Sequence, residues 1–412
     1  MKHIKSIRIL SLALACLTLN ACKSDDTDLC DYIYNLEHQQ GGDDTPTYPD
    51  ITIDRSPLTN DEEETDVTAD DMVENITTST TIGLSFSDND VTTSGSNSAV
   101  RITRNGAHVK VVCAKKGLKL VLSGQTTDGS LQVFSDNKYV IEMNGVSITN
   151  PSGPAINNQG KKTCYVVLDD GTTNTLTDGT GYAVETNGIQ SKGAFFSEGQ
   201  LVFSGSGSLD VYGNNKHGIA SDDYVRIRKG TDIYINVAKH NGTSGSGIKA
   251  KDGIYINGGI VNIEANADGG KGINCEDSVI VSGGRLVVVN TGAPIIDASI
   301  PDTTSCAGIK TDMAFILKGG DIALLSKGDG GKGVNSTGNI LVSGGNLNVV
   351  TLGPKVLASP KGIKTQGDMT VTGGSISSFS MYASPLDVAG TMNYGSATMT
   401  YTYKNKAVTI KY

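Results

Sequence analysis

Six lysines occupy two fixed positions in a phrase that this 412-residue chain repeats. Lys249, Lys310 and Lys364 each stand two residues after the glycine that opens the phrase. The other three each stand one residue before that glycine: Lys271, Lys332 and Lys361. A regular line of ammonium groups suits an extended polyanion, such as a chain of uronic acids. The alternative is a solvated face whose lysines pair with neighbouring acids, at about 0–1 kcal/mol per pair.

Carboxylates form a second series, four and five residues after the same glycine. Its members include Asp222, Asp223, Asp252 and Asp277. Carboxylates stacked in register repel one another unless a cation lies between them, and calcium takes about six to eight oxygen ligands. We therefore predict calcium at these four aspartates. The alternative is that Lys251 and other bases neutralise the row.

Two nearly identical loops offer further oxygen ligands. The run Asp-Gly-Gly-Lys-Gly begins at Asp268 and again at Asp329, and it echoes calcium-binding nonapeptide repeats. Those repeats follow one another directly, whereas this run recurs only once. We include both aspartates among the candidate calcium ligands.

The phrase that carries these residues begins with Gly-Ile or Gly-Val and occurs six times. It opens at Gly218, Gly247, Gly272, Gly308, Gly333 and Gly362. In the last five copies a double glycine begins 11 residues after the opening glycine, as at Gly258 (258 − 247). A constant internal register joined by connectors of variable length is typical of a solenoid.

Apolar and polar residues alternate within each copy, which predicts half-buried strands, and the double glycine predicts a sharp turn between two strands. The third residue after the opening glycine is always small, which predicts a tight inward corner. Stacked coils would pair each strand in parallel with the coils before and after it. We predict an all-β, right-handed parallel β-helix of about ten coils over residues 81–379, closed by a C-terminal β cap over residues 380–412.

The N-terminus has the features of a secretion signal. Lys2, Lys5 and Arg8 precede an apolar run that ends at Leu19-Asn20-Ala21-Cys22, which resembles a bacterial lipobox. We predict a signal peptide over residues 1–22, a lipid on Cys22, and an outer-membrane lipoprotein exposed at the cell surface. The alternative is an ordinary signal peptide that is cut nearby.

Charge divides the mature chain. Residues 23–75 hold 17 acids and two bases, a net charge of −15, against −9 for the whole chain. We predict a disordered acidic tether over residues 23–80. No basic, aromatic-interleaved patch indicates nucleic acid, and we expect a monomer. A disulfide between Cys113 and Cys164 is possible, but the spacing does not establish it.

Three phrases together resemble a known family. They are Met143–Asn150 (Met-Asn-Gly-Val-Ser-Ile-Thr-Asn), Gly153–Ile156 (Gly-Pro-Ala-Ile) and Gly218–Asp223 (Gly-Ile-Ala-Ser-Asp-Asp). The chain is similar to the bacterial carbohydrate-binding β-helix family, whose fold is like that of pectate lyases and of family 9 polysaccharide lyases. The resemblance implies a secreted or surface protein that binds plant-type polysaccharide, with calcium in its coils.

The chain departs from that family's pattern in one place. The family often has an aspartate directly before the Gly-Ile pair, where this chain has His217, Ser246, Lys271, Ala307, Lys332 and Lys361. Calcium sites could therefore be replaced by cationic contacts. The chain also has no Trp, the usual platform for sugar rings.

Three hypotheses follow. The first is a surface lipoprotein that captures an extended acidic polysaccharide, polygalacturonate-like, through its lysines without cleaving it. The second is a calcium-dependent polysaccharide lyase, with Lys251 beside the aspartates as the base. The third is an adhesin or structural protein whose function lies in the longest connector, residues 289–307.

Overall fold

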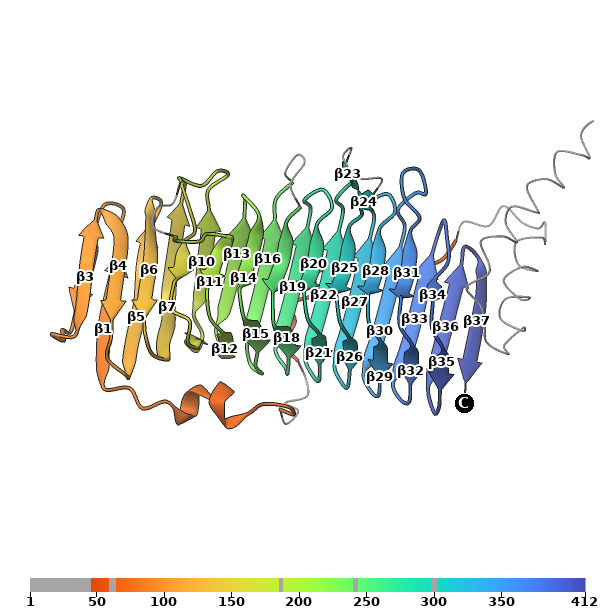
Figure 1. The fold of residues 1–412 in the computed structure, drawn as a ribbon, viewed down its shortest axis with the longest axis horizontal. Helices are drawn as coiled ribbons and strands as arrows, with labels where there is room; N and C mark the ends of the chain where they lie inside the picture. The colour runs from red at the N-terminus through yellow and green to blue at the C-terminus, as the bar shows by residue number, and fades with distance from the viewer. Residues whose placement is uncertain (1–45, 59–63, 185–187, 240–243, 298–301, 412) are drawn as a thin grey trace, which may run out of the picture.

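The computed structural model describes residues 46–58, 64–184, 188–239, 244–297 and 302–411. Its strands wind into a parallel solenoid of about 11 turns (Figure 1). Each turn gives one strand to each of three faces. The strands of one turn, β14, β15 and β16, pair in parallel with β17, β18 and β19 of the next. The predicted all-β parallel solenoid is therefore confirmed.

Face one is a 12-stranded sheet. Its strands are β3 (Val100–Asn105), β4 (Ala107–Cys113), β6 (Gly129–Ser135), β8 (Ile156–Asn158), β11 (Gly193–Ser197), β14 (His217–Ser221), β17 (Ser246–Ala250), β20 (Lys271–Cys275), β25 (Ala307–Thr311), β28 (Lys332–Ser336), β31 (Lys361–Thr365) and β34 (Leu386–Val388).

Faces two and three belong to one 23-stranded sheet. Face two contains β9 (Cys164–Leu168), β12 (Leu201–Gly205), β15 (Tyr224–Ile227), β18 (Gly253–Ile256), β21 (Val279–Val281), β26 (Phe315–Leu317), β29 (Ile340–Val342), β32 (Met369–Val371) and β35 (Met392–Tyr394). Face three contains β10 (Thr173–Asp178), β13 (Ser208–Gly213), β16 (Asp232–Val237), β19 (Ile260–Ala265), β22 (Arg285–Asn290), β27 (Asp321–Ser326), β30 (Asn346–Thr351), β33 (Ser375–Ser380), β36 (Thr398–Tyr403) and β37 (Lys406–Lys411). The remaining strands of this sheet lie at the N-terminal end: β1 (Thr80–Phe86), β2 (Val91–Ser94), β5 (Leu118–Thr126) and β7 (Tyr139–Asn150).

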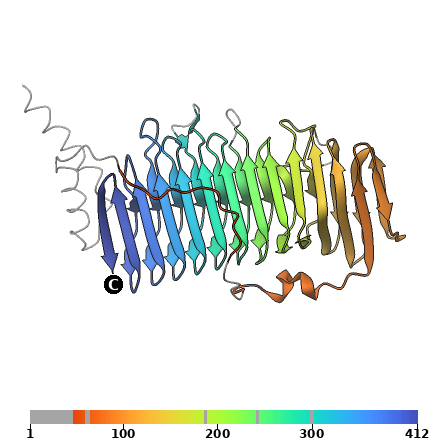
Figure 2. The same cartoon turned by 180° about the vertical axis from the view of Figure 1, so that it is seen from behind.

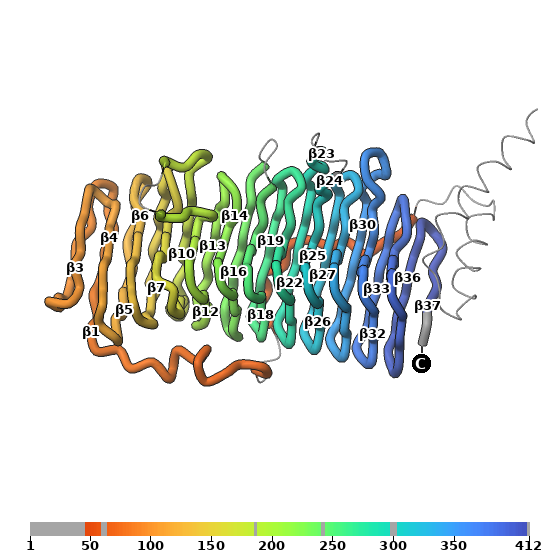
Figure 3. Tube along the Cα trace, viewed as in Figure 1, coloured from red at the N-terminus to blue at the C-terminus, as the bar shows by residue number. Residues whose placement is uncertain are grey.

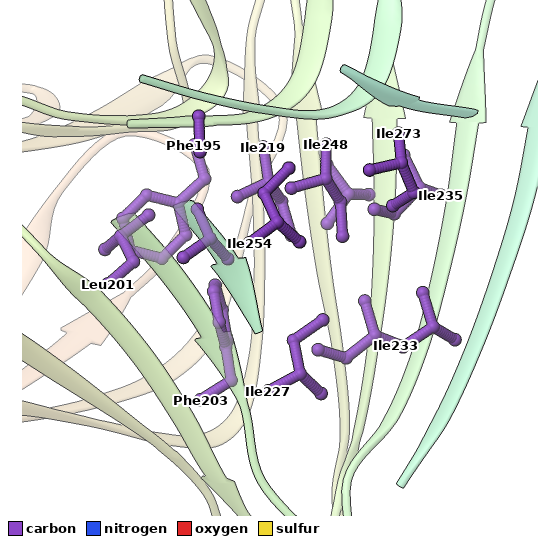
Figure 4. Packing of buried hydrophobic residues seen from close by; sticks show 14 of the residues in the cluster. Phe195, Leu201, Phe203, Ile219, Ile227, Ile233, Ile235, Ile248, Ile254 and Ile273 are labelled. Atoms are coloured by element: carbon purple, nitrogen blue, oxygen red, sulfur yellow. The ribbon is translucent and has the colours of Figure 1, made fainter. Parts of the chain in front are cut away.

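Equivalent apolar residues stack along the inside of the solenoid, because parallel strands in register place them one above another. Ile219, Ile248 and Ile273 are successive partners on face one, and all three are fully buried. Figure 4 shows their side chains side by side with those of faces two and three. The core is thus one continuous column.

The glycines of the phrase are explained by two different constraints. The opening Gly247 has no room for a side chain, because an added Cβ would lie 2.4 Å from Cγ2 of Ile263. The second glycine of the pair, Gly259, has φ +73°, a backbone region that favours glycine. The small third residue fits the predicted corner: Ser336 is buried and donates a hydrogen bond from its hydroxyl to the carbonyl of Gly338 at 2.8 Å.

The C-terminal cap is shorter than predicted. We expected residues 380–412 to end the repeat, but β34, β35 and β36 pair in parallel with β31, β32 and β33 and add another turn. Only β37, antiparallel to β36, follows it. The glycine phrase is absent there, so stacking on the preceding coil rather than local sequence maintains this turn.

The predicted tether differs from the structure in its C-terminal part. Residues 46–58 and 64–79, which we call the strap, lie along the outside of the solenoid (Figures 2 and 3). The strap includes the 3-10 turns η1 (Ala69–Asp71) and η2 (Val73–Asn75). Residues 1–45 and 59–63, including the predicted signal, Cys22 and the first part of the tether, lie outside the described residues. Within the described residues, no helix is long and apolar enough to cross a membrane.

The first part of the strap covers an apolar patch on face three. Ile51 is 5% exposed and belongs to a cluster with outward side chains of successive strands: Val287, Leu325, Val350 and Phe379. Tyr48 contacts Phe379, with ring centroids 5.2 Å apart. Burial of apolar surface therefore holds this part in place.

The second part binds face two through ion pairs and also through Val73 and Ile76, which pack on an apolar cluster there. Arg228 pairs with Glu64 at 2.8 Å and with Glu74 at 2.7 Å. Arg226 pairs with Asp71, and its guanidinium lies 4.3 Å from the ring centroid of Tyr255. Three of the acids that suggested a disordered tether are thus partners of solenoid arginines.

The cysteines of the described part are not cross-linked. Cys113, Cys164, Cys275 and Cys306 are all free thiols, and all four are buried. Burial raises the pKa of Cys164 to about 12 and that of Cys275 to about 11. They behave as small apolar residues of the interior.

Candidate functional site

The lysines of the phrase lie in columns on face one. Lys249, Asn274, Lys310, Asn335 and Lys364 are successive partners across β17, β20, β25, β28 and β31. The predicted stacking is therefore correct for the three lysines, which lie two coils apart, about 10 Å. We call the outer side of face one from β17 to β34 the ladder face.

The second lysine column lies closer to the interior than we expected. Ser246, Lys271, Ala307, Lys332 and Lys361 are successive partners, but Lys271 is only 6% exposed. Burial, followed by the nearby charge of Lys310, lowers the pKa of Lys271 to about 8. A ligand could therefore reach the outer column more easily than Lys271.

Two of these lysines hold the twin glycine loops. Lys271 donates a hydrogen bond to the carbonyl of Gly269, and Lys332 donates one to that of Gly330 at 3.1 Å. Both carbonyls belong to the Asp-Gly-Gly-Lys-Gly runs. These loops lie where face three joins face one, so the two ammonium groups secure the edge of the ladder face.

The two charged series partly neutralise one another, in agreement with the alternative of a solvated face whose lysines pair with neighbouring acids. Lys249 pairs with Glu276 of the next coil at 2.7 Å, and Lys310 pairs with Asp312 at 2.6 Å. Lys361 pairs with Asp387 at 3.0 Å. Each of these side chains is between about one fifth and one half exposed to solvent. The ion pairs are therefore weak, and a ligand carboxylate could replace the protein carboxylate.

Lys364 differs from the other lysines of its column. It has no ion pair with any residue of the described part of the chain. Its cross-strand neighbour Asp387 pairs with Lys361 instead. Lys364 is the member of the column most ready to bind an anionic group.

Three of the four stacked aspartates predicted to bind calcium have other partners, and Asp252 is the exception among the described residues. Asp222 pairs with Lys192, and Asp223 accepts a hydrogen bond from the Gln200 amide. Burial and the neighbouring charge of Asp252 are among the causes that raise the pKa of Asp223. Asp277 accepts a hydrogen bond from the Ser278 hydroxyl at 2.9 Å.

The aspartates of the twin loops brace the next loop along the solenoid. Asp268 accepts the backbone N–H of Ala293 at 3.1 Å, and Asp329 accepts those of Val356 and Leu357. Among the described residues, no three His, Cys, Asp or Glu side chains gather where they could hold a metal ion. The six aspartates therefore do not fit a carboxylate cage, and calcium binding by them stays an untested prediction.

Sequence reasoning missed the amides that alternate with the lysines. Asn274 and Asn335 are half-buried and occupy the outer column between lysines. The Oδ1 atom of Asn274 is itself buried without a hydrogen-bond partner among the described residues, so this amide offers a ligand only its Nδ2 donor. The signal was present in the sequence, because two of the three copies that lack lysine at this position, in β20 and β28, have asparagine there, whereas the first copy has Ala220. An amide with both polar atoms accessible offers a donor and an acceptor to a sugar hydroxyl.

Exposed apolar side chains border the ladder face. Its connectors carry Ile296, Val356, Leu357 and Tyr382, each about half exposed or more. Ile296 lies in a small hairpin of β23 (Ile295–Asp297) and β24 (Asp302–Thr304), inside the longest connector that the adhesin hypothesis singled out. These residues could contact the apolar faces of sugar rings, a role for which the sequence offers no Trp.

The outer column extends to a hollow at the N-terminal end. Lys110, Gln132 and Asn157 are successive partners across β4, β6 and β8, and they line a hollow of about 300 Å³. Pro154 and Ala183 contribute to its wall. Between this hollow and β17 the column continues through Phe196 and Ala220, both buried.

A larger hollow of about 600 Å³ lies on another side, where faces two and three meet beside the strap. Arg55 borders it and is held by ion pairs to Asp210 and Asp232 at 2.7 and 3.0 Å. Its glycine turns carry no column of free ammonium or amide groups. The ladder face is therefore the better candidate for an elongated ligand.

Comparison with known proteins gives a solved structure and a family model. A solved structure described as a polysaccharide lyase-like protein from C. thermocellum is 18% identical, with a TM-score of 0.39, and the match covers 79% of this chain and 99% of that chain. No curated protein matches. A family model described as carbohydrate-binding domain-containing protein matches residues 96–277 and 241–401, so this chain belongs to that carbohydrate-binding family.

Proposed function

We propose that this protein is a surface lipoprotein that binds an extended acidic polysaccharide along its ladder face without cleaving it. One observation carries the proposal: ammonium and amide groups alternate in one outer column, coil after coil, from Lys249 to Lys364. Adjacent groups are about 4.8 Å apart, so a chain lying along the solenoid meets one polar side chain per coil.

The charge on the face favours an anionic chain over a neutral one. Lys364 has no carboxylate partner in the described part, and the pairs of Lys249 and Lys310 are partly exposed. A ligand carboxylate can replace an exposed protein carboxylate at little cost, since such pairs contribute about 0–1 kcal/mol. The amides of Asn274 and Asn335 would bind hydroxyl groups between the charges.

Binding of polygalacturonate oligomers at several salt concentrations tests the proposal. Calorimetric affinity should fall steeply between about 0.05 and 0.5 M salt, because exposed ion pairs are screened. An uncharged glucan of equal length serves as the control and should bind more weakly. Affinity that does not change with salt, or equal binding of the two glycans, would exclude the charged column as the recognition element.

The same samples test for cleavage. Lyase action on a uronate chain creates unsaturated ends that absorb in the ultraviolet, because a base removes the proton beside the carboxylate. We expect no increase in absorbance over hours. An increase that requires added calcium would instead make the protein a lyase.

Membrane attachment is a separate part of the proposal. It is supported by the lipobox-like residues that end at Cys22 and by the acidic residues that follow. Expression of the chain and of Cys22→Ser, followed by membrane fractionation and mass measurement, tests it. A lipid-sized mass on the wild-type chain alone is the expected result.

A further inference from the structure

The strap determines from which end of the solenoid the preceding chain departs. Tyr48, near the start of the strap, packs on Phe379 of β33, close to the last turn. Further along the strap, Asp54 exchanges hydrogen bonds with Asn262 of β19, and Asp71 pairs with Arg226 of β15. The strap thus runs back from the C-terminal coils, and β1 then begins the solenoid at the opposite end (Figure 2).

The course of the strap determines which end of the solenoid lies nearest to an anchored Cys22. A tether entering at residue 81 would place the first coil nearest to an anchored Cys22. With the strap packed, about 24 residues separate Cys22 from the C-terminal coils. The described chain thus begins at the C-terminal end of a solenoid that is about 50 Å long.

The C-terminal end also differs in charge from the rest of the protein. Residues 389–412 contain three lysines, at 404, 406 and 411, and no acid, although the whole chain has a net charge of −9. Lys404 and Lys406 lie at the turn between β36 and β37, and Lys404 lies 5.2 Å from the ring centroid of Tyr403. Tyr403, a residue type that is enriched at membrane interfaces, lies beside this turn, whereas Tyr394 and Tyr401 pack in or against the core.

The two features meet at one place. Phe379, which contacts Tyr48, is the cross-strand partner of Thr402, and Thr402 is the partner of Ala407. Tyr48, near the first described residue, therefore lies on β33, and β36 and β37 with the basic turn follow directly beside it. A lipid anchor on the chain that precedes residue 46 would bring this turn toward the membrane.

We propose that the C-terminal end of the solenoid, with the basic β36–β37 hairpin, docks on an anionic lipid surface while the N-terminal hollow points outward. The orientation rests on the lipoprotein part of the proposed function. The column of Lys249 to Lys364 would then run away from the membrane, so a bound polysaccharide would extend outward from the cell.

Energy transfer to headgroup-labelled lipid measures the orientation of the lipidated protein in vesicles of phosphatidylglycerol and phosphatidylethanolamine. Two samples are prepared, both with Cys30→Ser. The dye is attached at Asn405→Cys in the first sample and at Asp88→Cys, in the β1–β2 turn, in the second. The four described cysteines are buried and should not react. Transfer should be several-fold stronger from position 405, and equal or reversed efficiencies would overturn the orientation.

Sedimentation of non-lipidated Cys22→Ser protein with vesicles tests the docking surface independently of the anchor. Binding to phosphatidylglycerol vesicles should exceed binding to phosphatidylcholine vesicles. Replacing Lys404, Lys406 and Lys411 by Ser should reduce it more than tenfold, because each lysine near an anionic surface contributes about a fivefold factor. The matched control replaces Lys110, Lys115 and Lys116, at the other end.

The outcomes separate this inference from the proposed function. If Cys22 proves not to be lipidated, the sedimentation experiment still decides whether the basic hairpin binds anionic lipid. If both lysine triplets weaken sedimentation equally, or neither does, the C-terminal end is not a docking surface, whatever the glycan experiments show.

Discussion

Arg226 of β15 and Asp71 of the strap form an ion pair across 155 residues of sequence, with Nε and Oδ2 3.2 Å apart and side chains only 6% and 3% exposed. Arg226 also donates a hydrogen bond to Oδ1 of Asn257 at 2.6 Å, and Tyr224 donates one to Asp71. The strap is therefore part of the folded protein and not a layer of screened surface charges.

Asp71→Ala should lower the free energy of unfolding by about 3–5 kcal/mol, because it leaves the Arg226 charge buried and unpaired. Urea unfolding followed by circular dichroism measures it. The control is Asp70→Ala. Asp70 forms an ion pair with Lys138 at 3.2 Å, but the Asp70 side chain is largely exposed to solvent. That change should cost less than about 1 kcal/mol, and equal losses would show that Asp71 is not buried in solution.

Ile51→Ala should destabilise the packing of the strap on face three by about 2–4 kcal/mol, because a buried side chain is removed from an apolar cluster. Hydrogen exchange of β27 and β30, which carry part of that cluster, reports the loosening. Thr52→Ala, at the exposed neighbouring position, should leave exchange unchanged. Similar exchange in both variants would contradict the contact between the strap and this face.

Lys271→Met should remove the cost of keeping this ammonium buried at pH 7, roughly 2–3 kcal/mol, and the lost hydrogen bond to the carbonyl of Gly269 should offset part of that gain. The pKa is lowered from 10.5 to about 8, so the folded state loses its proton before the unfolded state does. Wild-type stability should therefore rise between about pH 8 and 10.5 relative to the variant, and the advantage of the variant should disappear above that range.

Lys332→Met is the matched control for that measurement. Lys332 occupies the same column and donates to the equivalent loop carbonyl, but it is more exposed. Its substitution should produce a smaller stability change. A difference between Lys271→Met and wild type that does not vary with pH would show that burial does not perturb the Lys271 ammonium.

Gly247→Ala should destabilise the solenoid by more than about 2 kcal/mol, because the new Cβ would overlap the Ile263 side chain and lie 2.8 Å from the carbonyl oxygen of Gly272. Thermal unfolding measures the loss. Gly181→Ala is the control, since an added Cβ there meets nothing within 4 Å. Equal midpoints for the two variants would mean that the opening glycine is not a packing requirement.

Lys364→Ala should weaken binding of an acidic oligosaccharide about three- to tenfold and reduce its salt dependence, because one exposed cationic contact is lost. Asn335→Ala should weaken binding with no change in salt dependence. The control is Lys161→Ala, an exposed lysine on a turn outside the column. A larger effect at Lys161 than at Lys364 would move the binding site off the ladder face.

Sequence alone determined the repeat, the parallel solenoid and the columns that join Lys249, Lys310 and Lys364. These features follow from local rules: period-two alternation fixes which side chains face inward, and glycine fixes where the chain turns. The family resemblance agrees with the match to a carbohydrate-binding family. Identical registers in successive coils then stack equivalent residues without further information.

Only the tertiary structure decided which charges meet and where residues 46–79 lie. The pairs of Lys249 with Glu276 and of Arg226 with Asp71 depend on side-chain reach between coils and on segments far apart in sequence. A clue was visible in Val287 and Leu325, apolar residues at outward positions that require a cover. The alternation of residues along the strands does not reveal which segment covers this patch. The strap fits a surface that forms only after several coils have stacked.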